Sequence, residues 1–149
     1  MNEKEEKTTG AVTMSAELAE KEIMQWAENN DIDMIGATFD DNDKLALKMA
    51  KERLVKAMTR GALTVNDKGN FVYTVSDKSP DGWAGSVVEM SPPNGRAYMS
   101  IDNYKTSQLN HKIIAITSAM TGKDIGWFSN LHNTDYKMFT GITQLFMSA

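Results

Sequence analysis

The sequence has no cysteine among its 149 residues. This absence excludes a disulfide framework, a cysteine nucleophile, an iron–sulfur cluster and any zinc site built on thiolates. Histidine is also scarce, because His111 and His132 are the only two and lie far apart in the chain. No apolar run approaches the ~20 residues that a membrane helix needs. The first ten residues are charged, which is not the pattern of a secretory signal, so a cytoplasmic protein is expected.

Motifs of catalysis and ligand binding are also missing. No glycine-rich phosphate loop and no G-x-S-x-G elbow is present. The segment 31–36 begins like a calcium-binding loop, but its fifth position is Ile35 and its twelfth is Asn42, where a bidentate glutamate is required. We therefore predict no catalytic, cofactor-binding or metal-binding residue, and a protein that is not an enzyme.

The composition that is present is typical of a globular protein. A length of 149 residues corresponds to one domain, and 41% apolar residues can form a core without disulfides or metals. Methionine is abundant, with 11 residues. Because methionine is flexible and polarisable, it fills irregular gaps in cores and also forms adaptable binding surfaces. Both interpretations stay open at this stage, and the first is favoured.

Charge is distributed unevenly along the chain. Residues 1–43 hold 12 acidic and 3 basic residues, whereas residues 44–78 hold 3 acidic and 8 basic ones. We therefore expect the acidic helix near the N-terminus to face the lysine-rich helix that follows it, through Glu17, Glu20, Glu22 and Glu28. The basic helix over 44–60 is the one candidate for nucleic-acid binding. Because the sequence pI is 5.2 and no aromatic residues interleave with its charges, we predict no specific nucleic-acid binding.

Hydrophobic spacing and turn residues predict an α+β fold. Helices are expected from about 15 to 29, from the caps at 40–43 to Arg60, after Gly95 as far as Tyr104, over 107–120, briefly after Asp124, and from 133 or 134 to the end. Leu109 is expected among the buried residues of the helix over 107–120. A β-hairpin is expected over 63–65 and 71–75, and a third strand over 83–90. Together these elements form a small antiparallel sheet, made of the hairpin plus the third strand, that is packed by several α-helices.

The same patterns divide the chain into three parts. We expect a disordered tail over 1–13, a helical N-terminal lobe over 14–61, and a hairpin plus C-terminal helical region over 62–149.

Two groups of apolar residues are candidates for binding a partner. The last helix has a strongly apolar face made of Phe139, Ile142, Leu145 and Phe146, which either offers itself to a partner or belongs to the core. In the basic helix, Leu45 and Met49 fall outside the apolar stripe, so we expect this helix to be contacted on more than one side.

The region 62–147 carries an ordered series of short motifs. A hairpin and a strand end in the turn 90–96, and a helix with the central acid Asp102 follows. An apolar helix ends in Thr121-Gly122, and Asp135-Tyr136 opens a final helix that ends in Leu145-Phe146. In this order of motifs, the region resembles tail assembly chaperones of long-tailed bacteriophages. The acidic first helix and the basic second helix are not part of the matched pattern.

The resemblance implies a non-catalytic protein made in the cytoplasm of an infected host cell. Such a chaperone binds the tape measure protein and helps tail tube subunits assemble around it. It implies no cofactor. The hydropathy and the charge of the sequence predict no membrane and no specific nucleic acid as partners, and a second copy of the chain stays open as a further partner. The alternatives are a structural protein of the virion, such as a neck or tail component, and, less favoured, a small nucleic-acid-binding protein that uses the helix 44–60.

Overall fold

The structure is a computed structural model that describes residues 13–148. Apart from Thr13, the predicted tail over 1–13 lies outside the described residues. The chain forms, in order, α2 (Ala16–Asn29), α3 (Asp41–Thr59), β1 (Leu63–Val65), β2 (Phe71–Thr74), β3 (Val87–Met90), α4 (Gly95–Met99), the 3-10 turn η1 (Thr106–Gln108), α5 (Leu109–Thr121), α6 (Ile125–Phe128) and α7 (Asn133–Met147). The expected α+β class, with a small antiparallel sheet and several helices, is confirmed.

The two first helices begin where the capping residues predict. The Ser15 side chain accepts a hydrogen bond from the backbone N–H of Leu18 (3.2 Å), and Asp40 accepts one from Asp43 (2.8 Å). These bonds satisfy backbone donors that the first turn of a helix leaves free. The N–H of Thr13 bonds the carbonyl of Thr59 (2.7 Å), so the chain enters the fold beside the end of α3.

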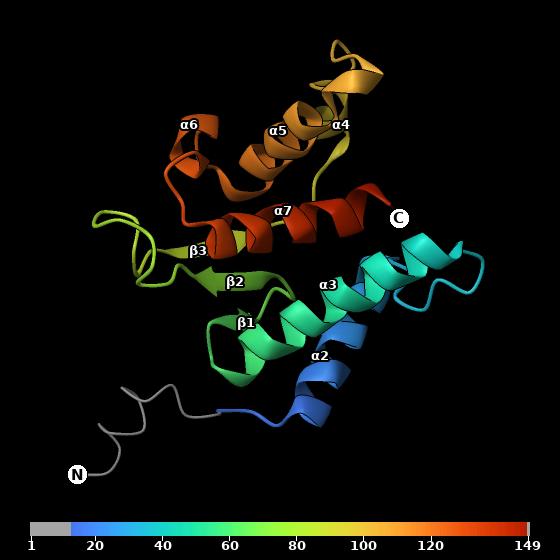
Figure 1. The fold of residues 1–149 in the computed structure, drawn as a ribbon, viewed down its shortest axis with the longest axis vertical. Coiled ribbons are helices and arrows are strands. Elements are labelled where there is room, and N and C mark those ends of the chain that lie inside the picture. Colours follow the sequence, from blue (N-terminus) through green and yellow to red (C-terminus); the bar gives the residue numbers. More distant parts are fainter. Residues whose placement is uncertain (1–12, 149) are drawn as a thin grey trace.

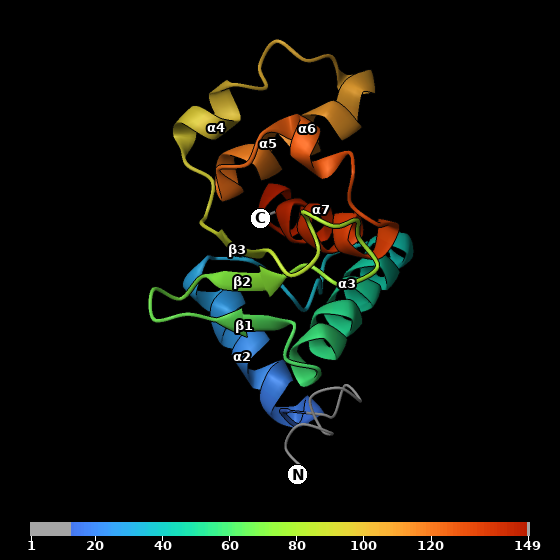
Figure 2. The same cartoon turned by 90° about the vertical axis from the view of Figure 1, so that its left-hand side faces the viewer.

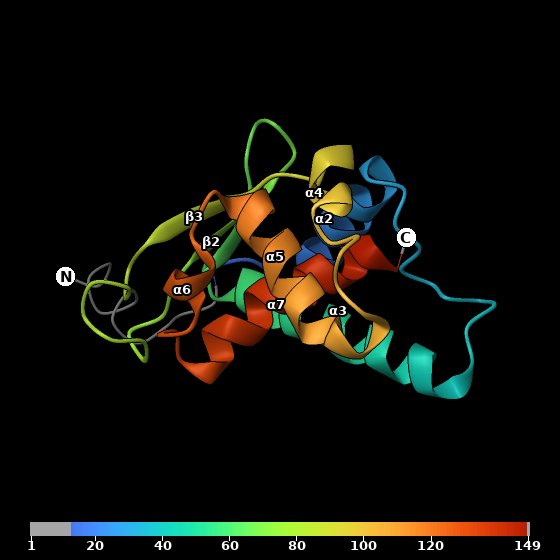
Figure 3. The same cartoon turned by 90° about the horizontal axis from the view of Figure 1, so that it is seen from above.

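Helix α7 occupies the centre of the molecule. In Figure 1, it runs between an upper group formed by α4, α5 and α6 and a lower group formed by the sheet, α2 and α3. The view from above shows α5 lying over α7 (Figure 3). The buried hydroxyls of Thr117 in α5 and Thr143 in α7 are 2.6 Å apart and join these two helices. Because other elements lie on both sides of α7, this helix buries side chains on more than one of its faces.

The sheet has the order β1-β2-β3 and is antiparallel throughout. Alternate residues share one face of a strand. One face is accordingly buried and is formed by Leu63, Phe71, Tyr73, Val88 and Met90. Trp26 of α2 stacks on Phe71 of this face, with ring centroids 4.2 Å apart. Figure 2 shows α2 lying behind β1 and β2.

The third strand is shorter than predicted. We expected it over 83–90, but β3 begins only at Val87. The preceding residues form a tight turn, in which Trp83 and Ala84 both donate to the carbonyl of Pro80. Gly82 and Gly85 adopt positive φ angles of 94° and 83° there. The alternation of apolar and polar residues that starts at Trp83 therefore does not indicate a strand over its first four residues, which lie in a turn.

Two further predictions on the helices after the sheet are wrong. The helix that begins at Gly95 ends at Met99 instead of continuing to Tyr104. Leu109, which was expected to be buried, is 53% exposed. It is the first residue of α5, and the burial of that helix begins one turn later at Ile113.

A single hydrophobic core unites the described chain. Its buried residues come from α2, α3, the sheet, α5, α6 and α7. The predicted N-terminal lobe over 14–61 thus shares its core with the region 62–149. Among residues 13–148, most methionines belong to this core or pack against it, and only Met49 and Met99 are largely exposed. Among residues 13–148, no helix combines the length and apolar character needed to cross a membrane.

Candidate partner-binding groove

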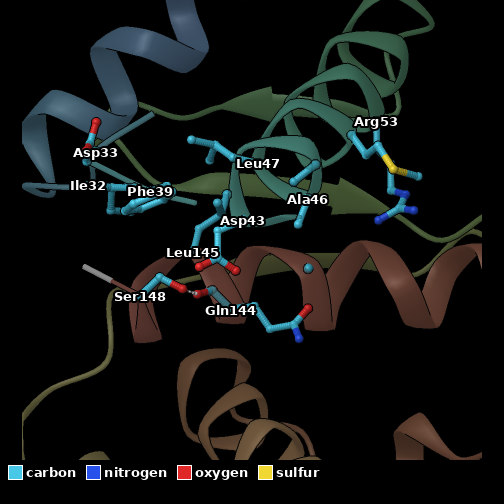
Figure 4. Close-up of a pocket in the computed structure, with 13 residues that line it drawn as sticks. Ile32, Asp33, Phe39, Asp43, Ala46, Leu47, Arg53, Gln144, Leu145 and Ser148 are labelled. Atoms are coloured by element: carbon cyan, nitrogen blue, oxygen red, sulfur yellow. Dashed lines mark hydrogen bonds between the residues drawn. The ribbon is translucent and has the colours of Figure 1, made fainter. Parts of the chain in front are cut away.

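A groove of about 580 Å³ lies between α3 and α7, and the segment 32–39 forms its third wall. Figure 4 shows side chains from all three parts lining it. Its lining is more apolar than polar and includes Phe39, Ala46, Leu47, Ala50 and Leu145. We call this feature the α3–α7 groove.

The α3 wall results from a helix that is only partly covered. Of the residues 41–50, Leu47 alone is buried. Leu45 is 57% exposed and Met49 is 52% exposed. The small side chains of Ala46 and Ala50 leave space beside the helix, and charged residues border the wall, with Asp43 near one end and Arg53 toward the other.

On the α7 side, the groove is wider at Gly141, because this residue has no side chain to fill the space. A Cβ atom built on Gly141 would lie 3.7 Å from a guanidinium nitrogen of Arg53, which is ordinary contact distance. Gln144 is exposed on the next turn of α7, and both residues line the groove. Small residues on facing helices therefore create the space between α3 and α7.

The third wall is held by local hydrogen bonds. The N–H of Ile32 donates to the carbonyl of Ala27 (2.8 Å), which anchors the segment to the end of α2. Asp33 accepts hydrogen bonds from the N–H groups of Gly36 and Ile35, both at 2.9 Å. Both bonds lower the pKa of the Asp33 carboxyl, and the bond from Gly36 contributes more than the bond from Ile35. The carboxylate that resembled a calcium ligand in the sequence therefore closes a turn.

The structure separates the two predicted groups of partner-binding residues. Phe139, Ile142 and Phe146 lie in the core, with exposed fractions of 0%, 1% and 8%. Leu145 is also buried, but it borders the groove. Of the two roles considered for the apolar face of α7, partner surface or core, most of the face is core, because α5 and the sheet enclose this helix. Leu45 and Met49, by contrast, remain accessible.

The most extensive buried polar cluster surrounds Asp135 in the first turn of α7. This side chain is 0% exposed and accepts four hydrogen bonds. The donors are the hydroxyl of Tyr73 (2.6 Å), the N–H and hydroxyl of Ser76 (3.0 and 2.8 Å), and the hydroxyl of Ser79 (2.6 Å). The cluster ties the loop after β2 to the start of α7.

The pKa values in this cluster follow from the hydrogen bonds. Burial alone would raise the pKa of Asp135, but the bonds from Ser79, Tyr73 and Ser76 together hold it below its ordinary value. The pKa of the Tyr73 hydroxyl is raised by burial and then by its bond to Asp135. Asp135 is therefore a charged acceptor at neutral pH, and Tyr73 a neutral donor.

Serine, histidine and aspartate meet in this cluster, but they do not form a catalytic triad. A triad needs the histidine ring between the serine and the carboxylate. Here the Ser79 hydroxyl bonds Asp135 directly, and His132 contributes its backbone N–H to Ser79 (2.8 Å). The His132 ring accepts a hydrogen bond from Thr134 (3.1 Å) and caps α7. The geometry indicates a structural network.

Metal-ligating and charged residues also have local roles. Among residues 13–148, no group of three or more acidic or histidine side chains could hold a metal ion. The expected pairing of the acidic and basic helices is limited to one ion pair in the described chain, between Lys51 and Glu20 (2.7 Å). Glu17, Glu22 and Glu28 form none there.

The chain shows no similarity to known proteins from which a role of these sites could be transferred. Comparison of the chain with protein-family models, curated proteins and solved structures finds no match.

Two features of these sites could not be found by sequence reasoning alone. The small residues Ala46, Ala50 and Gly141 lie on helices far apart in the chain, and no motif links them. The Asp135 cluster joins residues separated by 56 to 62 positions. The one available signal was Asp135 itself, an acid at a helix start, which is explained equally well by the helix dipole.

Proposed function

We propose that this protein is a non-catalytic chaperone of phage tail assembly that binds a helical segment of its client in the α3–α7 groove. The observation that carries this proposal is the groove itself, an open and mainly apolar channel of about 580 Å³ between two helices. Amphipathic helices dock in such grooves through apolar side chains at helical spacing.

The chemistry of the groove suits a client with a variable sequence. Ala46, Ala50 and Gly141 provide space without demanding a particular shape, and the exposed Met49 lies at the rim as an adaptable apolar contact. Asp43 and Arg53 are ten residues apart on α3, which is about 15 Å along a helix. Opposite charges at this separation would favour one direction of a docked helix.

The chaperone class itself comes from the motifs of residues 62–147. By that resemblance, the client is the tape measure protein, the tail tube protein is a second partner, and the site of action is the cytoplasm of the host cell. The structural role of the Ser79, His132 and Asp135 side chains supports the non-catalytic part of the proposal.

A co-expression experiment tests the proposal. The tape measure protein, which the resemblance implies as the client, would be produced alone, with this chain, and with this chain carrying Gln144→Trp. Gln144 is exposed and lines the groove, so the substitution obstructs docking while leaving the core intact. Gln25→Trp, on the exposed side of α2, is the matched control.

We expect the tape measure protein to remain in solution with the native chain and with Gln25→Trp, and to precipitate with Gln144→Trp. Equal precipitation in every case would overturn the proposal. Mass spectrometry of purified particles gives a second measure, because a chaperone is absent from the finished virion. Stoichiometric presence of this chain in particles would favour a structural neck or tail component instead.

A further inference from the structure

The two ends of the α3–α7 groove carry opposite charges. Asp33 and Asp43 line one end, which we call the acidic end. Arg53 lines the other, and a narrow extension of the groove beside Arg53 is also lined by Lys137 of α7. We call this second pair the basic end. In Figure 4, Arg53 lies at the right of the groove, and Asp33 and Asp43 lie to its left.

These charged side chains are exposed, and nothing in the described chain neutralises them. Among residues 13–148, the one ion pair joins Lys51 and Glu20, so neither end of the groove contains an ion pair. The bonds from Ile35 and Gly36 both go to the same carboxylate oxygen of Asp33. Because two like charges line each end, a ligand group of the opposite charge is favoured at each end.

The backbone of α7 adds to the negative charge of the acidic end. This helix runs from the basic end, where Lys137 is in its second turn, to the acidic end, where Ser148 lines the groove. The C-terminal end of a helix carries partial negative charge, and the last turn of α7 contains no basic residue. The positive end of α3 lies at the same end of the groove, but Asp41 and Asp43 occupy its first turn.

The part of the groove between the charged ends suits an apolar helix face. Ala46, Ala50 and Gly141 line it with little or no side chain. Asp43 and Arg53 are ten residues apart on α3, which is about 15 Å or three helical turns. A helix bound along α3 therefore meets opposite charges about three turns apart, with room for apolar residues at intervals of three or four between them.

We propose that the α3–α7 groove binds an amphipathic helix that has acidic residues in its first turn and basic residues about three turns later. Its first turn lies at the basic end and its last turn at the acidic end, so the bound helix is antiparallel to α3. The same charges stabilise the client helix itself, because acids are favourable at a helix start and bases at a helix end. This inference rests on the proposed function and names the chemical class of the client segment.

Two synthetic peptides of about 20 residues test the charge pattern. Both carry the same stripe of leucine and alanine at helical spacing. The charged peptide has glutamates in its first turn and lysines in its last turn, and the neutral peptide has glutamines at these positions. Fluorescence anisotropy at about 50 mM salt measures the Kd of each for the full chain, since low salt screens these pairs least. We expect the charged peptide to bind about tenfold more tightly.

Reversal of the basic end identifies the contacts. In the chain with Arg53→Glu and Lys137→Glu, we expect the charged peptide to lose its advantage and the neutral peptide to bind within about threefold of its native affinity. Retained binding of the neutral peptide shows that the groove is still folded. The matched control carries Lys44→Glu and Lys48→Glu, which change the net charge equally at exposed sites outside the groove lining. This control should keep the preference for the charged peptide.

The outcomes distinguish this inference from the proposed function. Equal binding of the two peptides by the native chain would overturn the charge pattern and leave the groove as a helix-binding site. Equal loss of the preference in both double variants would also overturn it, because net charge would then be the cause. If neither peptide bound at up to ~1 mM, the proposed binding of a helix in the groove would itself fail.

A cross-linking experiment tests the direction of the bound helix. The chain has no cysteine, so Ser148→Cys introduces a single thiol at the acidic end. The charged peptide is prepared with one cysteine at its N-terminus or at its C-terminus. Under mild oxidation, we expect the C-terminal cysteine to form the disulfide several-fold faster. With Gln25→Cys, on the exposed side of α2, the two peptides should react equally. Equal rates with Ser148→Cys, or a faster N-terminal cysteine, would overturn the direction.

Discussion

Helix α7 and the first half of α3 were both expected to offer apolar side chains to a partner, but the fold treats them differently. Helix α7 is enclosed by α5 and by the lower group of elements, and Phe139 and Ile142 are almost completely buried. Residues 41–50 of α3 have cover on one side only, and Leu45 and Met49 are more than half exposed. An apolar side chain at helical spacing therefore indicates a contact, but the neighbouring elements decide whether that contact lies inside the molecule.

Truncation of Phe146 in α7 should show most strongly that this helix is buried whereas the first half of α3 is exposed. Phe146→Ala removes a ring that packs edge-on against Trp26 at 5.3 Å between centroids. We expect the free energy of unfolding to fall by about 3–5 kcal/mol, measured by chemical denaturation. Met49→Ala, at an exposed site on α3, should change this free energy by less than about 0.5 kcal/mol. A comparable loss in both variants would remove the distinction between the two helices.

Loss of the buried carboxylate at the start of α7 should be the next largest effect. Asp135→Asn leaves the donors of Tyr73, Ser76 and Ser79 with a neutral and less capable acceptor. We expect a loss of about 2–3 kcal/mol in the free energy of unfolding. Asp102→Asn, at an exposed site, is the control and should be close to neutral. If the two variants were equally stable, the network would have no structural importance.

The same carboxylate should give a defined pH dependence. The pKa of Asp135 is lower in the folded protein than its ordinary value, so its contribution is present above the unfolded pKa of about 3.9. The contribution is lost as pH falls through the folded pKa. The difference in stability between native protein and Asp135→Asn should therefore be constant near neutrality and shrink in acid. Denaturation curves at several pH values test this, and a difference that grew in acid would contradict the assignment.

A substitution in the groove should stabilise the protein. Gly141 is within α7, and an added Cβ meets nothing closer than Arg53 at 3.7 Å. Because alanine is the better helix former, Gly141→Ala should raise the free energy of unfolding by about 0.5–1 kcal/mol. Gly122→Ala is the opposite case, since Gly122 ends α5 with φ of 74° and should resist any side chain. Thermal unfolding of the two variants should therefore shift in opposite directions.

The smallest effect should come from the ion pair between the acidic and basic helices. Lys51 and Glu20 are partly exposed, so removing either should cost no more than about 1 kcal/mol. Hydrogen exchange over residues 15–29 should show protection that persists at high salt, because Ile23 and Trp26 hold α2 to the core. Protection that disappeared with added salt would mean that charge pairing positions α2.

Much of the fold could be predicted from local patterns. Ser15 and Asp40 mark the starts of α2 and α3, and the short segment between the first two strands marks the hairpin. The errors arose where a local pattern had two physical explanations. The residues after Trp83 alternate as in a strand but form a turn, and Leu109 has helical spacing but lies in the first turn of α5, before the helix reaches the core.

The sequence by itself determined where α2, α3 and the two hairpin strands begin, because capping side chains and alternating apolar residues act within a few positions of one another. It did not determine the start of β3, where alternation continues into a turn. Only the tertiary structure decided which apolar faces are covered, because burial requires another element to arrive at that face. The groove exists because Ala46, Ala50 and Gly141 face one another across two helices that are distant in the chain. Leu45 and Met49 remain exposed because, among residues 13–148, the buried side of this part of α3 is the side that carries Leu47.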